Sequence, residues 1–140
     1  TEQHTSYRER FYKTEFKIRN NLDAISHATC AMAIDVDAKG IVVCSVSGKT
    51  AGMVSRYRCP TDIVGMTTDE KVWRRLNLSW GVTPVLADEY SSMDVMFYNG
   101  LANAKKYLGL KEGDAVVLTG GPINGKRGNT NTIKVEVIEK

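Results

Sequence analysis

Short, nearly uninterrupted apolar runs constrain the fold of this chain more than any other feature. Four of them lie at 41–44 (IVVC), 62–66 (DIVGM), 82–87 (VTPVLA) and 115–119 (AVVLT). Unbroken apolar strands are typical of a sheet that is covered on both faces. Strands that alternate with helices form right-handed crossovers and a parallel sheet. The pattern therefore predicts an α/β domain.

Helical spacing of apolar residues fills the segments around these runs. It predicts helices at 21–37, around 51–57, from a cap at Thr67 or Thr68 through Trp80, and from Ser91 or Ser92 to about Leu108. Each predicted helix precedes or follows one of the apolar runs. The alternation thus extends from residue 21 to the fourth strand.

The last strand differs from the others because no helix precedes it. Residues 132–138 (TIKVEVI) alternate between apolar and polar, and they follow a Gly/Asn-rich loop at 120–131. We therefore expect this strand to run antiparallel at an edge of the sheet, while Pro84 places the third strand at an edge as well. The predicted fold is a three-layer α/β/α domain at 21–140, with a five-stranded, mostly parallel sheet.

Residues 1–20 are mixed charged and aromatic, and we expect them to form an arm or linker from a preceding domain. The chain begins at Thr1 rather than Met, so we also expect it to be a piece of a longer protein. Its 140 residues suit one domain.

Composition excludes several classes of function. A net charge of +3 is too small to indicate a nucleic-acid partner. No apolar run is long enough to span a membrane, and the first residues are too polar for a signal peptide. Cys30, Cys44 and Cys59 lack metal-site spacing, as do His4 and His27, so we expect reduced cytoplasmic thiols and no metal site.

The loop after the first strand has the residues of a phosphate site. Ser45, Ser47 and Thr50 offer hydroxyl donors, Gly48 allows close approach of backbone N–H groups, and Lys49 adds charge. The helix that starts near Thr50 directs its positive end at the same place. A plain helix cap remains the alternative interpretation.

A P-loop is a poor match to the same segment. Gly48-Lys49-Thr50 matches the end of that motif, but the full pattern needs a glycine where Val43 stands. An atypical phosphate-binding hydrolase that uses Lys49 and Thr50 is therefore only a lesser alternative.

The Gly-rich loop after the fourth strand is the second candidate. Its members that could close over an anion are Gly125, Lys126, Arg127, Gly128, Asn129 and Thr130. Ligands of open parallel sheets bind beyond the carboxyl ends of the strands, where both loops are expected. A surface loop that merely carries two charges is the alternative. Because the chain lacks a catalytic triad or paired-carboxylate constellation, we expect anion binding without catalysis.

Motifs from about residue 20 to the end of the chain resemble the C-terminal domain of pyruvate kinase. The segments that carry the resemblance are 23–28 (DAISHA), 40–43 (GIVV), 47–51 (SGKTA), 54–58 (VSRYR), 78–85 (LSWGVTPV), 113–117 (GDAVV), 129–131 (NTN) and 133–135 (IKV). Their order and spacing fit along nearly the whole domain. The resemblance implies the same five-stranded fold.

The resemblance also implies a regulatory role. In pyruvate kinase, the site that converts phosphoenolpyruvate and ADP to pyruvate and ATP in glycolysis lies in a separate barrel with its Mg²⁺ and K⁺ ligands. We therefore expect this chain to be inactive alone, to hold no cofactor, and to have its own catalytic domain as a partner in the full-length enzyme.

Family members activated by sugar phosphates hold one phosphate in the SGxT-type loop, which maps onto Ser45, Ser47, Gly48, Lys49 and Thr50. The Gly-rich loop, here around 122–131, closes over the ligand. Some members bind the second phosphate of fructose 1,6-bisphosphate with a Trp and an Arg that residues 88–94 lack. Two kinds of effector therefore stay open. One is a sugar monophosphate, and the other is a bisphosphate whose second phosphate is held by Lys126 or Arg127.

The family forms tetramers through its first helix and last strand, so the resemblance implies a homo-oligomer. Two alternatives remain. One is an assembly-only domain that binds no effector, and the other is a monomer in which Lys134 and Glu136 protect the edge of the sheet.

Overall fold

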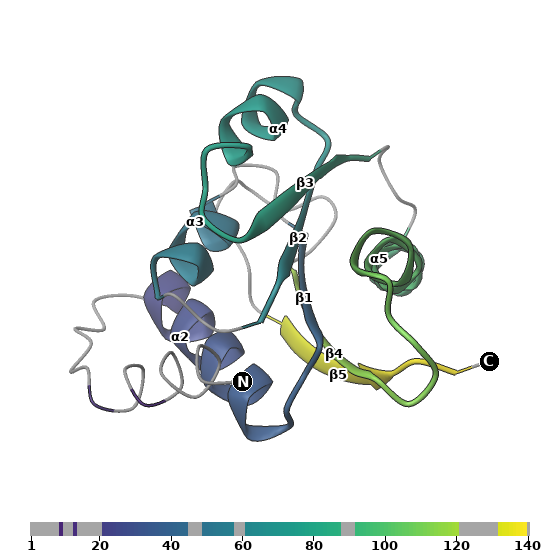
Figure 1. The fold of residues 1–140 in the computed structure, drawn as a ribbon. Coiled ribbons are helices and arrows are strands. Elements are labelled where there is room, and N and C mark those ends of the chain that lie inside the picture. The colour runs from purple at the N-terminus through teal and green to yellow at the C-terminus, as the bar shows by residue number, and fades with distance from the viewer. Residues whose placement is uncertain are drawn as a thin grey trace.

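The computed structural model describes residues 21–44, 49–57, 61–87, 92–120 and 132–139, together with Glu9 and Lys13. Four helices and five strands follow one another in these ranges (Figure 1). They are α2 (Asn21–Asp35), β1 (Gly40–Cys44), α3 (Lys49–Arg56), β2 (Ile63–Thr67), α4 (Glu70–Leu76), β3 (Val82–Leu86), α5 (Met93–Leu108), β4 (Ala115–Gly120) and β5 (Thr132–Val137). The prediction of alternating helices and strands is confirmed.

The five strands form one sheet in the order β3-β2-β1-β4-β5. The first four strands are parallel to one another, and β5 pairs antiparallel with β4. The edge positions predicted for β3, from Pro84, and for the last strand are both confirmed. Chain order changes direction between β1 and β4, because β2 and β3 extend the sheet on one side and β4 and β5 on the other.

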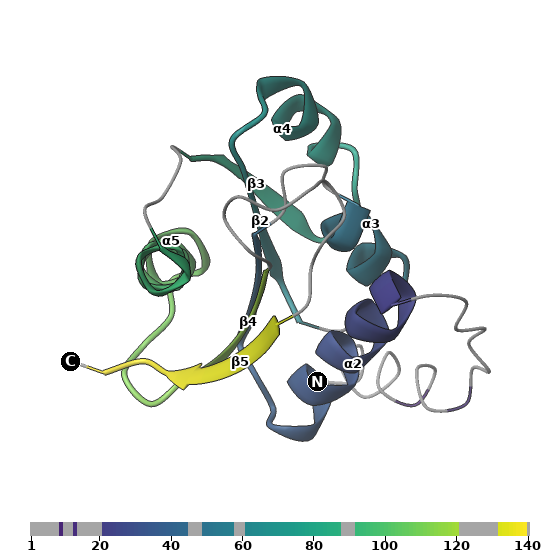
Figure 2. The ribbon, with the colours of Figure 1, turned by 180° about the vertical axis from the view of Figure 1, so that it is seen from behind.

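Helices cover the sheet on both sides (Figures 1 and 2). On one face α2, α3 and α4 pack around Ile41, Val43 and Val117, and on the other α5 packs around Val42 and Leu118. Every residue of β1 and β2 is buried, which accounts for their unbroken apolar sequences. The predicted three-layer α/β/α fold is confirmed.

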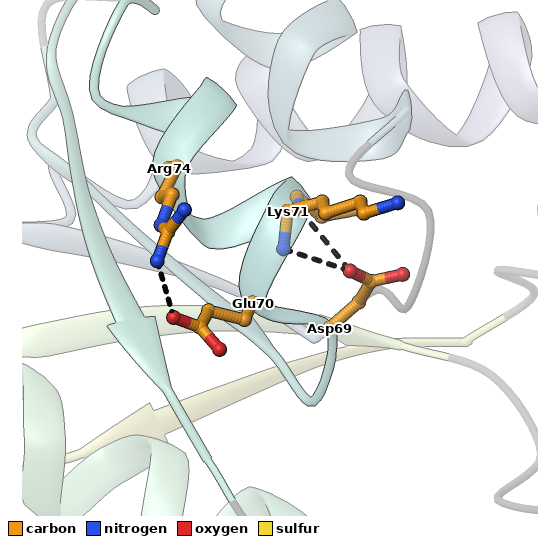
Figure 3. Close-up of polar contacts among 5 residues, drawn as sticks. Asp69, Glu70, Lys71 and Arg74 are labelled. Atoms are coloured by element: carbon orange, nitrogen blue, oxygen red, sulfur yellow. Dashed lines mark hydrogen bonds and ion pairs between the residues drawn. The ribbon is translucent and has the colours of Figure 1, made fainter.

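Helix α4 is shorter than the sequence predicts, and its cap is a different residue. Asp69 is the N-cap, and its carboxylate accepts hydrogen bonds from the backbone N–H groups of Lys71 and Val72 (Figure 3). The predicted cap Thr67 is still in β2, where its hydroxyl accepts from the Asp69 N–H at 3.1 Å. The helix ends at Leu76, so the prediction that it continues through Trp80 is wrong.

An ion pair on the exposed side of α4 stabilises its first turns. The Arg74 guanidinium lies 2.6 Å from the Glu70 carboxylate, one helical turn away (Figure 3). Pairs of this spacing stabilise a helix by about 0.3–0.5 kcal/mol. The cap and this pair together support a helix of only seven residues.

Both ends of α5 follow the sequence prediction. The Ser92 hydroxyl accepts from the Val95 N–H at 3.2 Å and caps the start of the helix. Gly109 ends it in the left-handed conformation, with φ of 63°. The long helix is thus bounded by residues whose types favour those positions.

The expected arm at 1–20 lies outside the described residues, apart from Glu9 and Lys13. Both of these are helical and exposed.

Candidate functional site

The carboxyl ends of β1 and β4 lie side by side at the centre of the sheet. Their register pairs Val43 with Thr119, so Cys44 and Gly120 end the two strands at neighbouring positions. The segment 45–48 leaves from the first end and the segment 121–131 from the second. Strand order reverses direction at this point, which is where open α/β sheets bind their ligands.

Gly120 lets these two strand ends and α5 come close together. A Cβ atom at this position would lie 2.9 Å from the Met96 Cε, 3.3 Å from the Phe97 Cε1 and 3.4 Å from the Cys44 Cβ. The first two distances are shorter than ordinary van der Waals contacts. The glycine therefore serves close packing beneath the strand ends, at the point where the Gly-rich segment begins.

Helix α3 begins directly after the first segment, at Lys49. Thr50 lies in its first turn with a fully buried side chain, and no acidic residue stands in that turn. Arg56 lies in the last turn, so the charges of α3 follow its dipole. The start of α3 therefore presents a positive helix end at the carboxyl end of β1, without an acidic side chain in its first turn.

Contacts with α2 and with the turn before β3 hold α3 in place. The rings of His27 on α2 and Tyr57 after α3 meet edge to face, with centroids 5.8 Å apart. The Tyr57 hydroxyl donates to the Asp23 carbonyl at 3.4 Å, and the Ser55 hydroxyl donates to the Trp80 carbonyl at 2.6 Å. Burial, with smaller effects from Asp23 and Cys30, raises the pKa of Tyr57. These contacts hold the carboxyl end of α3, which is the end away from the candidate site.

The two ends of the Gly-rich segment are joined by the sheet. Gly120 pairs with Thr132 across β4 and β5, and the Thr119 hydroxyl donates to the Thr132 carbonyl at 2.9 Å. The segment 121–131 therefore starts beside the end of β1 and finishes one strand further out, at the start of β5. The sequence analysis did not identify this hydrogen bond. Its one sequence signal is a hydroxyl-bearing residue, Thr119, at the end of an apolar strand, directly before the Gly-rich segment.

The last residue of β1 adds no charge to the site. Burial raises the pKa of the Cys44 thiol to about 12, so the thiol is neutral at physiological pH. A neutral thiol neither repels a phosphate nor acts as a nucleophile.

Most of the predicted site residues lie outside the described residues. This applies to Ser45, Ser47 and Gly48, and to Gly125, Lys126, Arg127, Gly128, Asn129 and Thr130. The backbone of Lys49 and all of Thr50 are described, and both belong to the first turn of α3. The structure thus positions the ends of both segments, and their contacts with a ligand stay a prediction.

The described ranges contain no group of three or more His, Cys, Asp or Glu side chains that could hold a metal ion. Among the same residues, no helix has the length and apolar character needed to cross a membrane.

A family model described as "Pyruvate kinase, alpha/beta domain" matches residues 23–136. The match runs from the first turn of α2 to the next-to-last residue of β5 and so reaches all five strands. The chain belongs to this pyruvate kinase domain family. The resemblance seen in the sequence motifs is therefore confirmed.

Curated pyruvate kinases from several bacteria are similar to this chain. The Clostridium acetobutylicum protein is 36% identical over 121 residues, which are 86% of this chain and 26% of that protein. The Lactobacillus delbrueckii subsp. bulgaricus protein is 38% identical over 124 residues, 89% of this chain and 21% of that protein. The Staphylococcus epidermidis protein is 32% identical over 117 residues. The chain spans about a fifth to a quarter of the length of these pyruvate kinases.

Proposed function

We propose that this chain is the regulatory, effector-binding and subunit-contact domain of a cytoplasmic pyruvate kinase. The parent reaction, which converts phosphoenolpyruvate and ADP to pyruvate and ATP in glycolysis, takes place in a separate catalytic domain with its Mg²⁺ and K⁺. This domain binds a phosphorylated sugar and does no chemistry itself. Its partners are the catalytic domain and further copies of the enzyme.

One observation carries the effector proposal. The segments 45–48 and 121–131, both of a composition suited to anions, leave the sheet from adjacent strands at the reversal of strand order. The first-turn N–H groups of α3, which begins at Lys49, direct the positive end of the helix at this point. Lys126 and Arg127 belong to the segment that starts at the adjacent end of β4. Two segments of anion-binding composition that leave the sheet from neighbouring strand ends favour a phosphorylated ligand over a plain helix cap.

A thermal-shift titration tests the effector proposal. Fructose 1,6-bisphosphate and glucose 6-phosphate are the probes, with unphosphorylated fructose as the negative ligand. At 100 times its dissociation constant, a ligand adds about 2.7 kcal/mol of stability, which corresponds to a rise in Tm of roughly 10 °C. Lys49→Ala should abolish most of the rise.

Lys39→Ala is the matched control for this titration. Lys39 lies before the amino end of β1, where its ammonium is 3.5 Å from the Asp37 carboxylate. The control removes the same charge from the opposite end of the same strand, so the rise in Tm should persist. No rise at millimolar sugar phosphate, or an equal loss in both variants, would contradict the proposal.

An assembly-only domain is the second candidate, and a surface of the structure favours it. Val36 after α2, and Val135 and Val137 on β5, are each exposed by 40% or more on the face of the sheet that carries α2. The proposed contact with other subunits through the first helix and last strand would cover these side chains. Light scattering with and without sugar phosphate separates the two candidates, since a dimer indifferent to every sugar phosphate supports assembly alone.

A further inference from the structure

Two helices begin near the carboxyl ends of the central strands, one on each face of the sheet. Helix α3 starts after the segment that follows β1, and α5 lies on the opposite face (Figures 1 and 2). The start of α5 reaches the end of β4, because a Cβ atom at Gly120 would lie 2.9 Å from the Met96 Cε and 3.3 Å from the Phe97 Cε1. The proposed sugar-phosphate site therefore has an α3 side and an α5 side.

The α3 side favours an anion. Residues 45–55, which lead into α3 and form most of it, contain the basic residue Lys49 and no acidic residue. The first turn of the helix has no acidic side chain, so nothing in that turn offsets the positive end of the helix. A phosphate is therefore stabilised on this side of the site.

The α5 side has the opposite character. Residues 88–94, which lead into α5, contain three acidic residues and no basic residue. Asp94 is exposed and stands in the first turn of α5, where its carboxylate offsets the positive end of the helix. The Ser92 hydroxyl accepts from the Val95 N–H at 3.2 Å, so one of the free N–H groups at this end is already used. The start of α5 is thus capped and acidic, whereas the start of α3 is basic.

A lysine near Asp94 does not cancel this negative charge. Asp94 and Lys134 line the same groove between α5 and β5, together with Glu136. The Lys134 ammonium lies 2.7 Å from the Glu136 carboxylate. The hydrogen bond and the charge of Glu136 raise the pKa of Lys134, and the charge of Asp94 adds to this effect. Two carboxylates therefore face one ammonium group, and the α5 side stays negative.

This asymmetry of charge orients a sugar phosphate. Its phosphate is attracted to the start of α3 and repelled by the carboxylates at the start of α5. Carboxylates accept hydrogen bonds and sugar hydroxyls donate them, so the uncharged end of a sugar suits the α5 side. A second phosphate at that end would meet like charges instead.

We propose that the site takes a sugar monophosphate, with its phosphate at the start of α3 and its hydroxyl end toward the start of α5. This inference rests on the proposed effector role and names the class of ligand. The acidic start of α5 discriminates against a second phosphate and favours a ligand whose far end is neutral or cationic. Asp94 is a described residue that contributes to this selectivity.

Isothermal titration calorimetry with three derivatives of one sugar tests the selectivity. Glucose 6-phosphate has an uncharged far end, glucosamine 6-phosphate adds an ammonium group, and glucose 1,6-bisphosphate adds a second phosphate. Glucosamine 6-phosphate should bind most tightly, and the bisphosphate should bind about tenfold more weakly than glucose 6-phosphate. High salt should narrow these differences, because it screens charges exposed to solvent. An order of affinities that does not depend on salt would contradict charge as its cause.

The variant Asp94→Asn removes one carboxylate with little change in shape. It should bind glucose 1,6-bisphosphate roughly threefold to tenfold more tightly than wild type does, with a smaller effect on glucose 6-phosphate. Asp62→Asn is the matched control, because Asp62 is also exposed but directly precedes β2, at the opposite end of the sheet. This control should keep the wild-type affinities for all three ligands.

The outcomes separate this inference from the function on which it rests. A bisphosphate that binds as tightly as glucose 6-phosphate, or more tightly, overturns the inference and leaves the effector role standing. A wild-type ratio of affinities in Asp94→Asn overturns the assignment of selectivity to Asp94. A chain that binds none of the three ligands at millimolar concentration overturns the inference and the effector role together.

Discussion

Gly100 allows α5 to pack directly on the central strand of the sheet, and its replacement by alanine tests this packing. A Cβ atom at residue 100 would lie 2.9 Å from the Val42 Cγ1 and 3.5 Å from both the Leu118 Cδ2 and the Met66 Sδ. Val42 is fully buried between two neighbouring strands, and its branched side chain has few rotamers to choose from. The valine methyl therefore cannot move away cheaply.

Two opposing effects set the change in the free energy of unfolding of Gly100→Ala. Alanine gains about 1 kcal/mol over glycine inside a helix, while overpacking a close-packed core costs about 1–3 kcal/mol. With a contact this short against a stiff side chain, we expect Gly100→Ala to lower the free energy of unfolding by about 1–2 kcal/mol. Gly52→Ala is the matched control, because a Cβ in α3 would meet nothing within 4 Å. This control should gain about 0.5–1 kcal/mol.

Urea unfolding measures both variants, and a double-mutant cycle isolates the contact. The urea midpoint of Gly100→Ala should fall by about 0.5–1 M. In a Val42→Ala background the same change should cost at least about 1 kcal/mol less, because the methyl that it strikes is gone. The reasoning is refuted if Gly100→Ala stabilises the chain as Gly52→Ala does, or if its cost is unchanged in the Val42→Ala background.

Two further predictions concern α4 and β1. Asp69→Ala should lower the free energy of unfolding in urea by about 1 kcal/mol, because the Asp69 carboxylate accepts from two N–H groups at the start of α4. Asp69→Asn keeps an acceptor and should lower it much less. Equal losses in the two variants would contradict the role of Asp69 as a cap. Folding raises the pKa of Cys44 from 9.0 to about 12, so between these values only the unfolded thiol ionises. As the pH rises from 9.0 to about 12, the free energy of unfolding should therefore fall more steeply in wild type than in Cys44→Ala, by up to about 1.4 kcal/mol per pH unit. Urea unfolding at several pH values measures this, and an equal pH dependence in the two proteins would refute it.

The elements of the fold could be predicted from sequence because their local signals agree with their burial. β1 is buried on both faces and reads as an unbroken apolar run, while β5 is half exposed and reads as an alternating one. Ser92 and Gly109 stand at the ends of α5, where their chemistry is favoured. The order of the strands could not be predicted, because it depends on contacts between segments distant in sequence.

The error in α4 has a local cause. Val72, Leu76 and Trp80 recur at helical spacing, but only the first two belong to the helix. After Leu76 the chain turns through short hydrogen bonds, from the Asn77 N–H to the Arg74 carbonyl and from the Ser79 N–H to the Leu76 carbonyl. Trp80 follows in this turn at a position that periodicity alone cannot distinguish from a further helical turn.

Part of the candidate site followed from sequence as well. The general rule for parallel sheets predicts that both segments lie at the carboxyl ends of strands. Their adjacency depends on β1 pairing with β4, a long-range contact that no local pattern encodes. The close packing at Gly120 and the hydrogen bond from Thr119 to Thr132 likewise depend on tertiary structure.

The most direct test of the proposed sugar-phosphate site is an NMR titration of the ¹⁵N-labelled chain with fructose 1,6-bisphosphate and with glucose 6-phosphate. Sugar phosphates should change the amide shifts at the end of β1 and the start of α3, and at Gly120 and Thr132, whereas unphosphorylated fructose should change none. Amides at the opposite end of the sheet, such as those of Gly40 and Ala115, should stay unchanged. Shift changes centred on that opposite end, or none at millimolar sugar phosphate, would contradict the proposal that a phosphorylated sugar binds at the carboxyl ends of β1 and β4.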